Sequence, residues 1–154
     1  MRVKTLDHQE QKEDIISRCK VCNISMVDKD NRPYVLPFNF AYADNILYLH
    51  SSPDGKKIEI LEQNPHICAS FSTDHRLDHQ NEDVACSYSM RYRSVLLYGK
   101  VEFIDELEEK ERVLNLIMAH YTNKKGFKYS LPALKNVKVF KVKAERLHGR
   151  TFGY

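Results

Sequence analysis

The chain has 154 residues, 42% of them hydrophobic, and its 24 basic and 21 acidic side chains leave a formal charge of +3. This length predicts one domain over residues 1–154, with a sizeable core. The small net charge argues against a dedicated nucleic-acid-binding protein, and no apolar run approaches the ~20 residues of a membrane span. The segment Met1–His8 lacks the apolar region of a signal peptide. We therefore expect a cytoplasmic protein with neither nucleic acid nor membrane as a partner.

The four cysteines are Cys19, Cys22, Cys68 and Cys86. The C-x-x-C spacing of the first two is found in redox pairs and in halves of zinc sites. No second close pair of Cys or His completes a tetrahedral set, and Cys68 lies in an apolar segment. We expect reduced, mostly buried thiols that pack as small hydrophobic groups, and no metal site.

The N-terminal third is expected to contain a helix and two strands. Asp7 and Glu10 have the spacing of a capping box ahead of apolar residues at helical spacing, which predicts a helix over Asp7–Cys19. Val21–Val27 has the character of a strand, and turn residues separate it from a second strand over Arg32–Tyr42.

Two prolines, Pro33 and Pro37, fall within the second of these strands. Proline cannot donate a hydrogen bond to a neighbouring strand, so it is excluded from ordinary central strands. We expect an edge strand, a strand start, or a ladder interrupted to receive a ligand.

A strand running into a helix is the most informative local pattern. Ile46–Leu49 is short, apolar and preceded by turn residues, which predicts a buried strand. Ser52 fits as the N-cap of the helix that follows, with Pro53 as its first residue and Gly55 just behind, and the helix extends to about Gln63.

The start of that helix has the composition of a phosphate site. A helix N-terminus exposes unpaired N–H groups and a partial positive charge. Ser51 and Ser52 add hydroxyls, Lys56 and Lys57 add ammonium groups, and Gly55 lets a ligand approach the backbone. The alternative is a capped surface helix with two solvated lysines, because short Ser/Gly/Lys strings are common.

The middle of the chain predicts two strands around a polar loop. His66–Ser72 is the first strand, Thr73–Ala85 is the loop, and Cys86–Ile104 is a long strand with a bulge or bend at Gly99. The loop contains four residues that could ligate a metal, but their spacing fixes no geometry and favours a solvated or partner-facing loop. These residues are Asp74, His75, Asp78 and His79.

The C-terminal part predicts a helix and a strand. Asp105 has capping-box spacing to Glu108, and apolar residues on one face follow as far as Tyr121. Leu131–Ala133 is expected to be a connector, and Val137–Lys143 alternates apolar and basic residues like a half-buried strand. The number of predicted strands and helices favours a mainly β protein, a closed or split antiparallel β-barrel with accessory helices. The sequence contains no G-x-G-x-x-G string, so it does not predict a dinucleotide-binding fold.

Three strings carry a resemblance to a known family. They are His50-Ser51 followed by Lys56-Lys57, Leu61 and Asn64-Pro65; the strand Arg93–Glu102; and the segment Pro33–Phe40. Their spacing resembles the FMN-binding split barrel of pyridoxamine 5'-phosphate oxidase and its relatives, most closely the nitroimidazole-resistance (Nim-type) branch. The resemblance extends over roughly residues 8 to 145.

The resemblance implies a flavin site and a role for each matching residue. Ser51, Ser52, Lys56 and Lys57 would hold the phosphate of FMN, or alternatively of FAD. Leu36, Pro37, Phe38 and Asn39 would line the isoalloxazine ring, with His50 nearby as a candidate catalytic residue. Arg93 and Ser94 would reach the flavin from another strand. In this family the site lies at a homodimer interface, so some contacts would come from the partner chain.

Some positions depart from the oxidase pattern. Lys56 replaces an arginine, which removes bidentate phosphate geometry but keeps the charge, and Ser94 replaces a longer glutamine. The tail Arg146–Arg150 resembles a substrate-binding string of the oxidase, but the chain contains no Trp and lacks the segment that precedes that string. We therefore do not expect pyridoxamine phosphate as the substrate, and we interpret the tail as the end of the last strand.

The resemblance implies a flavin-dependent oxidoreductase that passes electrons through FMN or FAD to a small substrate of the nitroaromatic type. NADH or NADPH would bind only transiently as electron donor, because no dedicated fold is present. Two alternatives stay open: a flavin-binding sensor or storage module without turnover, and an oligonucleotide-binding barrel using the basic strand with Lys138, Lys141 and Lys143. The role of His50 is open between proton donor and shaping of the pocket.

Overall fold

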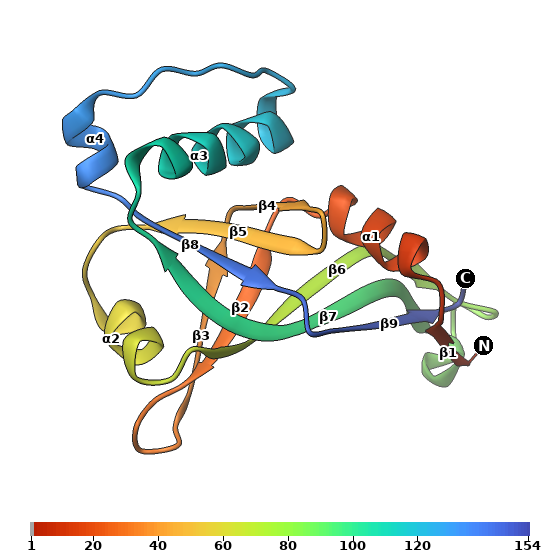
Figure 1. The fold of residues 1–154 in the computed structure, drawn as a ribbon. Helices are drawn as coiled ribbons and strands as arrows, with labels where there is room; N and C mark the ends of the chain where they lie inside the picture. Colours follow the sequence, from red (N-terminus) through yellow and green to blue (C-terminus); the bar gives the residue numbers. More distant parts are fainter. Residues whose placement is uncertain (1) are drawn as a thin grey trace.

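The computed structural model describes residues 2–154 and consists of a curved antiparallel sheet with helices around it (Figure 1). The strands are β1 (Val3–Leu6), β2 (Cys22–Val27), β3 (Pro33–Phe38), β4 (Phe40–Ala43), β5 (Ile46–Ser51), β6 (His66–Asp78), β7 (Ser89–Ile104), β8 (Lys138–Lys143) and β9 (Arg146–Phe152). The helices are α1 (Gln9–Arg18), α2 (Lys56–Gln63), α3 (Leu107–Thr122) and α4 (Leu131–Lys135), with a 3-10 turn at Ala85–Ser87.

The strands pair in the order β3-β2-β6-β7-β8-β5-β4, and β9 adds to β7 and carries β1 on its other side. All of these pairs are antiparallel. Figure 1 shows the two long strands β6 and β7 sweeping across the molecule, α3 and α4 together over one end, and the two termini close together at the other. This is the mainly β barrel with accessory helices that the sequence predicts.

Gly99 marks the place where β7 changes partners. Tyr92–Tyr98 of β7 pairs with β9, whereas Val101–Ile104 pairs with β8. A Cβ atom at Gly99 would lie 2.5 Å from the carbonyl oxygen of Lys143 and 2.6 Å from Cγ1 of Val142. Only glycine permits this close approach, so the predicted bend at Gly99 is confirmed and its cause is the crossing of β8.

Two apolar clusters make up the core. The larger one lies inside the barrel and contains the edge-to-face pair Phe40 and Phe71, whose ring centroids are 5.1 Å apart. Ile15 and Ile16 of α1 are fully buried against it. The smaller cluster lies between α3 and the sheet of β4, β5 and β8, and is formed by side chains such as Ile117 and Val139. The α3–α4 unit therefore covers the face opposite the barrel interior.

Three predicted helix starts are wrong by one or more residues. The N-cap of α1 is His8 rather than Asp7, and that of α3 is Glu106 rather than Asp105. The largest error is at α2, whose N-cap is Gly55 and not Ser52. Gly55 has a φ of 113°, a conformation that favours glycine, so the chain turns there before the helix begins.

Several strand predictions need correction. The expected loop Thr73–Ala85 is strand as far as Asp78, because β6 continues past an irregularity between Thr73 and Arg76 and pairs with β7 in a solvent-exposed extension. Polar composition reflects this exposure rather than a loop. The predicted strand Arg32–Tyr42 divides into β3 and β4 at Asn39.

Short elements near the termini were also missed. The expected connector Leu131–Ala133 is part of α4, which Ser130 caps by accepting a hydrogen bond from the N–H of Ala133. The tail Arg146–Arg150 belongs to a separate strand, β9, instead of ending β8. β1 pairs with β9 and was not anticipated, because its four residues Val3–Leu6 are largely exposed.

The edge position of the proline-containing strand is confirmed. β3 is the last strand of the order on its side, so Pro33 and Pro37 need to donate no second ladder hydrogen bond. The cysteines are free thiols; Cys19 and Cys22 are buried, but Cys86 is exposed. No helix among residues 2–154 is long and apolar enough to cross a membrane.

Candidate functional site

A cavity of about 430 Å³ lies where the end of β3, the end of β5 and the start of α2 meet. Its lining consists of residues that the sequence predicts as a binding site: Leu36, Pro37, Phe38, Asn39, His50, Ser51 and Lys57. We call this cavity the β3–β5 pocket. The structure therefore brings together seven of the eleven predicted site residues from three separate segments.

The β3 side of the pocket is shaped by strand alternation. Along β3, Leu36 and Phe38 turn toward the barrel, and Phe38 is buried edge-to-face against Phe140. Pro37 and Asn39 are exposed. An apolar strand end with an exposed backbone can accept a flat ring. Pro37 has no backbone N–H, so it presents no hydrogen-bond donor to that ring.

His50 forms the inner wall of the pocket. It follows three buried residues of β5 and pairs with Val139 of β8, which fixes its backbone. Its Nδ1 atom is buried and has no hydrogen-bond partner among the described residues. Burial lowers the pKa of His50 below its ordinary value, so the neutral imidazole is favoured near pH 7.

Hydroxyls and one ammonium group form the polar side of the pocket. The Nζ atom of Lys57 donates a hydrogen bond to Oγ of Ser52 across 3.0 Å. Oγ of Ser51 donates to the carbonyl oxygen of Ser52 at 2.8 Å, and Oγ of Ser52 donates to the carbonyl oxygen of Asp54 at 3.3 Å. These bonds order the turn that leads into α2 and hold the Lys57 ammonium beside the Ser52 hydroxyl.

The space beside Gly55 leaves room for the predicted approach of a ligand to the backbone. No atom lies within 4 Å of a Cβ built there, so the space beside it is open, and its φ of 113° is what requires glycine. The N–H groups of Ile58 and Glu59 both bond to the carbonyl oxygen of Gly55. The two preceding N–H groups, those of Lys56 and Lys57, have no partner within the helix and face the turn.

Lys56 points away from the β3–β5 pocket. Its Nζ atom lies 4.8 Å from the ring centroid of Tyr34, and its side chain lines a neighbouring cleft with Asp28 and Asp30. The sequence analysis did not single out Tyr34 as the residue that Lys56 contacts. The alternation of side chains along β3 places Tyr34 on the same face as Leu36, and this pattern could have identified it.

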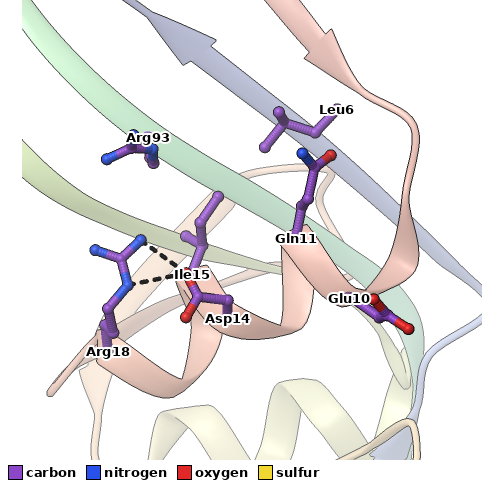
Figure 2. A pocket seen from close by; sticks show the side chains of 7 residues that line it. All are labelled: Leu6, Glu10, Gln11, Asp14, Ile15, Arg18 and Arg93. Atoms are coloured by element: carbon purple, nitrogen blue, oxygen red, sulfur yellow. Dashed lines mark hydrogen bonds and ion pairs between the residues drawn. The ribbon is translucent and has the colours of Figure 1, made fainter. Parts of the chain in front are cut away.

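Arg93 lies outside the pocket, in a cleft of about 510 Å³ between α1 and β7. Figure 2 shows it opposite the ion pair between Arg18 and Asp14 of α1. Its guanidinium bonds to Asp74 Oδ2 at 2.6 Å and stacks on Tyr154, 3.9 Å from the ring centroid. Asp74, which the sequence places in a solvated or partner-facing loop, also accepts a hydrogen bond from Arg18 at 2.7 Å.

Ser94 lies on the opposite face of β7 from Arg93, in a groove of about 560 Å³. Arg146, His148 and Arg150 of β9 line the same groove, because alternate residues of a strand share one face. Cations from the tail and a hydroxyl from β7 therefore meet on an open sheet face, separate from the β3–β5 pocket within one chain.

The donor set of the β3–β5 pocket fits a flavin mononucleotide group. A phosphate needs hydroxyl, ammonium or free N–H donors, and Ser51, Ser52, Lys57 and the start of α2 supply all three kinds. A flat ring needs an apolar wall with a few polar groups, which the end of β3 and His50 supply. Among residues 2–154, no group of three or more His, Cys, Asp or Glu side chains could hold a metal ion.

Fold and pocket together define a split β-barrel of the flavin-binding type. The family model for pyridoxamine 5'-phosphate oxidase matches residues 8–151. The chain therefore belongs to the pyridoxamine 5'-phosphate oxidase family, as its sequence strings suggest. Comparison with curated protein sequences gives no match.

Solved structures agree with this assignment. A candidate 5-nitroimidazole antibiotic resistance protein from Bacteroides thetaiotaomicron is 44% identical and superposes with a TM-score of 0.88, covering 98% of this chain and 88% of that chain. The resemblance to the nitroimidazole-resistance branch is therefore confirmed.

Two more distant structures share the fold. An FAD- and heme-binding protein from Mycobacterium smegmatis is 16% identical with a TM-score of 0.86, over 98% of this chain and 74% of that chain. An FAD-binding protein from Mesorhizobium loti is 24% identical with a TM-score of 0.71, over 99% of this chain and 100% of that chain.

Proposed function

We propose that this protein is a flavin-dependent oxidoreductase that binds FMN or FAD in the β3–β5 pocket and transfers electrons to a small substrate such as a nitroaromatic compound. The observation that carries the proposal is the convergence of β3, β5 and α2. These segments bring an apolar strand end, a histidine and a hydroxyl–ammonium cluster into one cavity. The family includes oxidoreductase-like flavin proteins, which supports the reaction class.

The side chains divide the work of binding. Ser51, Ser52 and Lys57 hold the phosphate through charge-assisted hydrogen bonds, and Lys56 adds a second positive charge at the same helix end. Leu36 and Phe38 provide the apolar wall for the ring, and the backbone of Pro37 and Asn39 lines its edge. When bound, the flavin supplies the hydride and electron transfer chemistry.

His50 offers a ring nitrogen beside that wall. Because the neutral imidazole is favoured, one nitrogen is a donor and the other an acceptor, and either can exchange a proton with a bound molecule. Oxidoreductase chemistry needs such a group when the substrate takes up protons together with electrons.

The proposed active form is a homodimer. Ser94 lies outside the β3–β5 pocket of its own chain, on an open sheet face, so it would contact the flavin held by the partner. The Arg93 side chain lies on the other face of β7, bonded to Asp74, and would have to leave that contact to reach the same flavin. The open groove with Ser94 and the cationic face of β9 supports this arrangement, because a second copy can cover it. NADH or NADPH, bound transiently, would supply the electrons.

The proposal is tested by anaerobic reduction of the flavin-loaded protein with NADH or NADPH, followed by a nitroimidazole. Bleaching of the flavin absorbance on adding the donor, and its recovery on adding the nitro compound, support the reductase. Flavin that binds but is not reduced by either donor would contradict catalysis and favour a sensor or storage role.

A further inference from the structure

A second cavity, of about 270 Å³, shares His50 with the β3–β5 pocket. It lies between α3, α4 and the chain around β5 and β8, is partly open to solvent, and has mostly apolar walls. The lining residues are His50, Leu114, Ile117, Met118, Tyr129, Ala133 and Val137. We call it the α3–α4 cavity, and His50 is the wall that it shares with the candidate flavin pocket.

Two residues of this lining each carry a buried polar atom that lacks a partner. Nδ1 of His50 and the hydroxyl oxygen of Tyr129 are buried side-chain atoms without a hydrogen bond among the described residues. A buried polar group that makes no hydrogen bond costs free energy, and native structures contain few of them. Two such groups at one apolar cavity therefore indicate a ligand whose own polar group bonds to them.

The lining also limits the charge and size of such a ligand. None of the described residues that line the cavity carries a fixed charge. Burial lowers the pKa of His50 and raises that of Tyr129, so both are neutral near pH 7. The volume lies just below the range for drug-sized ligands, about 300–1,000 Å³, so the cavity suits one ring and not a flavin.

We propose that the α3–α4 cavity binds a small, neutral, mostly apolar molecule with the size of a substituted single ring, whose polar group hydrogen-bonds to Tyr129 Oη and His50 Nδ1. Placed there, such a molecule contacts the residue that also lines the candidate flavin pocket. Its role as the substrate of a flavin reaction rests on the proposed function, whereas the binding itself does not.

The two aromatic probes phenol and benzene test the proposal directly. They match in shape, and only phenol carries a hydroxyl. The chain has four methionines, so methyl NMR of methionine-labelled protein gives few signals, and Met118→Leu identifies the signal at the cavity. We expect a saturable shift of the Met118 methyl with both probes and tighter binding of phenol. Met26 in the core and the exposed Met90 should not shift.

Two variants separate the contribution of the hydrogen bond to probe binding from that of the space in the cavity. Tyr129→Phe should weaken phenol binding about tenfold, the effect of one buried hydrogen bond, and leave benzene binding unchanged. Ala133→Leu should block both probes, because Ala133 lies in α4 at the exposed rim of the cavity. Lys135→Leu, on the same helix but outside the lining, is the matched control and should bind both probes as the wild type does.

The outcomes distinguish this proposal from the flavin proposal. Absence of a Met118 shift with either probe, or equal binding of phenol by wild type and Tyr129→Phe, would overturn it. Flavin affinity is measured separately on the same proteins. Probe binding without flavin binding would support the proposed ligand site in the α3–α4 cavity and contradict the proposed function. Flavin binding without probe binding would support the proposed function and contradict the ligand site.

Discussion

Lys57 Nζ lies 3.0 Å from Ser52 Oγ, across the turn that precedes α2. The bond holds an ammonium group and a hydroxyl side by side at a helix N-terminus. A site whose donors already have their geometry loses less conformational entropy on binding. This contact supports the proposed phosphate site in the β3–β5 pocket.

Replacing Lys57 with Ala should weaken flavin binding by about ten- to a hundredfold, because hydrogen bonds to charged groups contribute about 1.5–3 kcal/mol. The fold should persist, since the side chain is not part of the core. Quenching of flavin fluorescence measures the affinity, and circular dichroism checks the fold.

Lys56→Ala is the matched control at the adjacent position. Because Lys56 stacks on Tyr34 rather than lining the pocket, its loss should weaken flavin binding less than the loss of Lys57. An equal or larger effect at Lys56 would mean that its side chain turns to the phosphate when flavin binds. Loss of both lysines should give a folded protein that is purified without flavin, and retained flavin would contradict the phosphate assignment.

Gly99→Ala should destabilise the protein by about 2–3 kcal/mol or more, because the new methyl group would overlap the backbone of Lys143 and the side chain of Val142. Urea unfolding measures the change. Lys100→Ala, at the next and exposed position of β7, should change stability by less than about 0.5 kcal/mol. Similar effects of the two substitutions would contradict a close crossing of β8 at Gly99.

Asp74→Asn should lower the free energy of unfolding by about 1–2 kcal/mol at pH 7, since Asp74 bonds to both Arg18 and Arg93 in a partly exposed site. Hydrogen bonds from Arg18, and then from Arg93, lower the pKa of Asp74. The stabilisation is therefore complete above the unfolded pKa of about 3.9 and is lost as the pH falls through the lower folded pKa. The difference between wild type and Asp74→Asn should close in acid; a difference independent of pH would rule out the ion pairs as its cause.

His50 should titrate below the ordinary histidine pKa of about 6.5, because burial disfavours its charged form. With the folded pKa lowered, its contribution to stability is complete above the unfolded pKa and is lost as the pH falls through the folded pKa. NMR of the imidazole C–H signals measures the pKa, with His50→Gln to identify the signal. A pKa at or above 6.5 would contradict the neutral imidazole used in the proposed function.

A His50→Ala protein should keep its flavin affinity within a few-fold and change its turnover, if His50 exchanges a proton with the substrate. Unchanged kinetics with unchanged affinity would reduce His50 to shaping the two cavities that it lines. Steady-state rates with a nitroimidazole, measured on flavin-saturated protein, decide between these roles.

Much of the fold could be predicted because alternation and spacing encode it. The alternating segment ending at Lys143 forms β8 as expected, and Gly99 marked the bend in β7. Ser51 and Lys57 of the pocket were found from a local pattern, a strand followed by a hydroxyl- and lysine-rich helix start. The segment Leu36–Asn39 and His50 were found only through the resemblance to the family. Such patterns can be interpreted from the sequence because residues close together in the chain determine them.

What the sequence did not predict depends on contacts between distant segments. The ion pairs of Asp74 with Arg93 and Arg18 join β6, β7 and α1, and no local spacing in the sequence predicts them. Ser52 was mistaken for a helix cap because Gly55 takes an unusual φ that only the folded turn reveals. Tyr129 meets His50 across the α3–α4 cavity, although 78 residues separate them along the chain and none of the spacing rules links them.

The most direct test of the account is an equilibrium titration of FMN and FAD with the purified wild-type protein, followed by flavin fluorescence and absorbance. We expect saturable binding of at least one of the two flavins, stoichiometric with the chain, and weakened binding in Lys57→Ala. A protein that binds neither flavin under conditions in which it is folded would contradict the central claim.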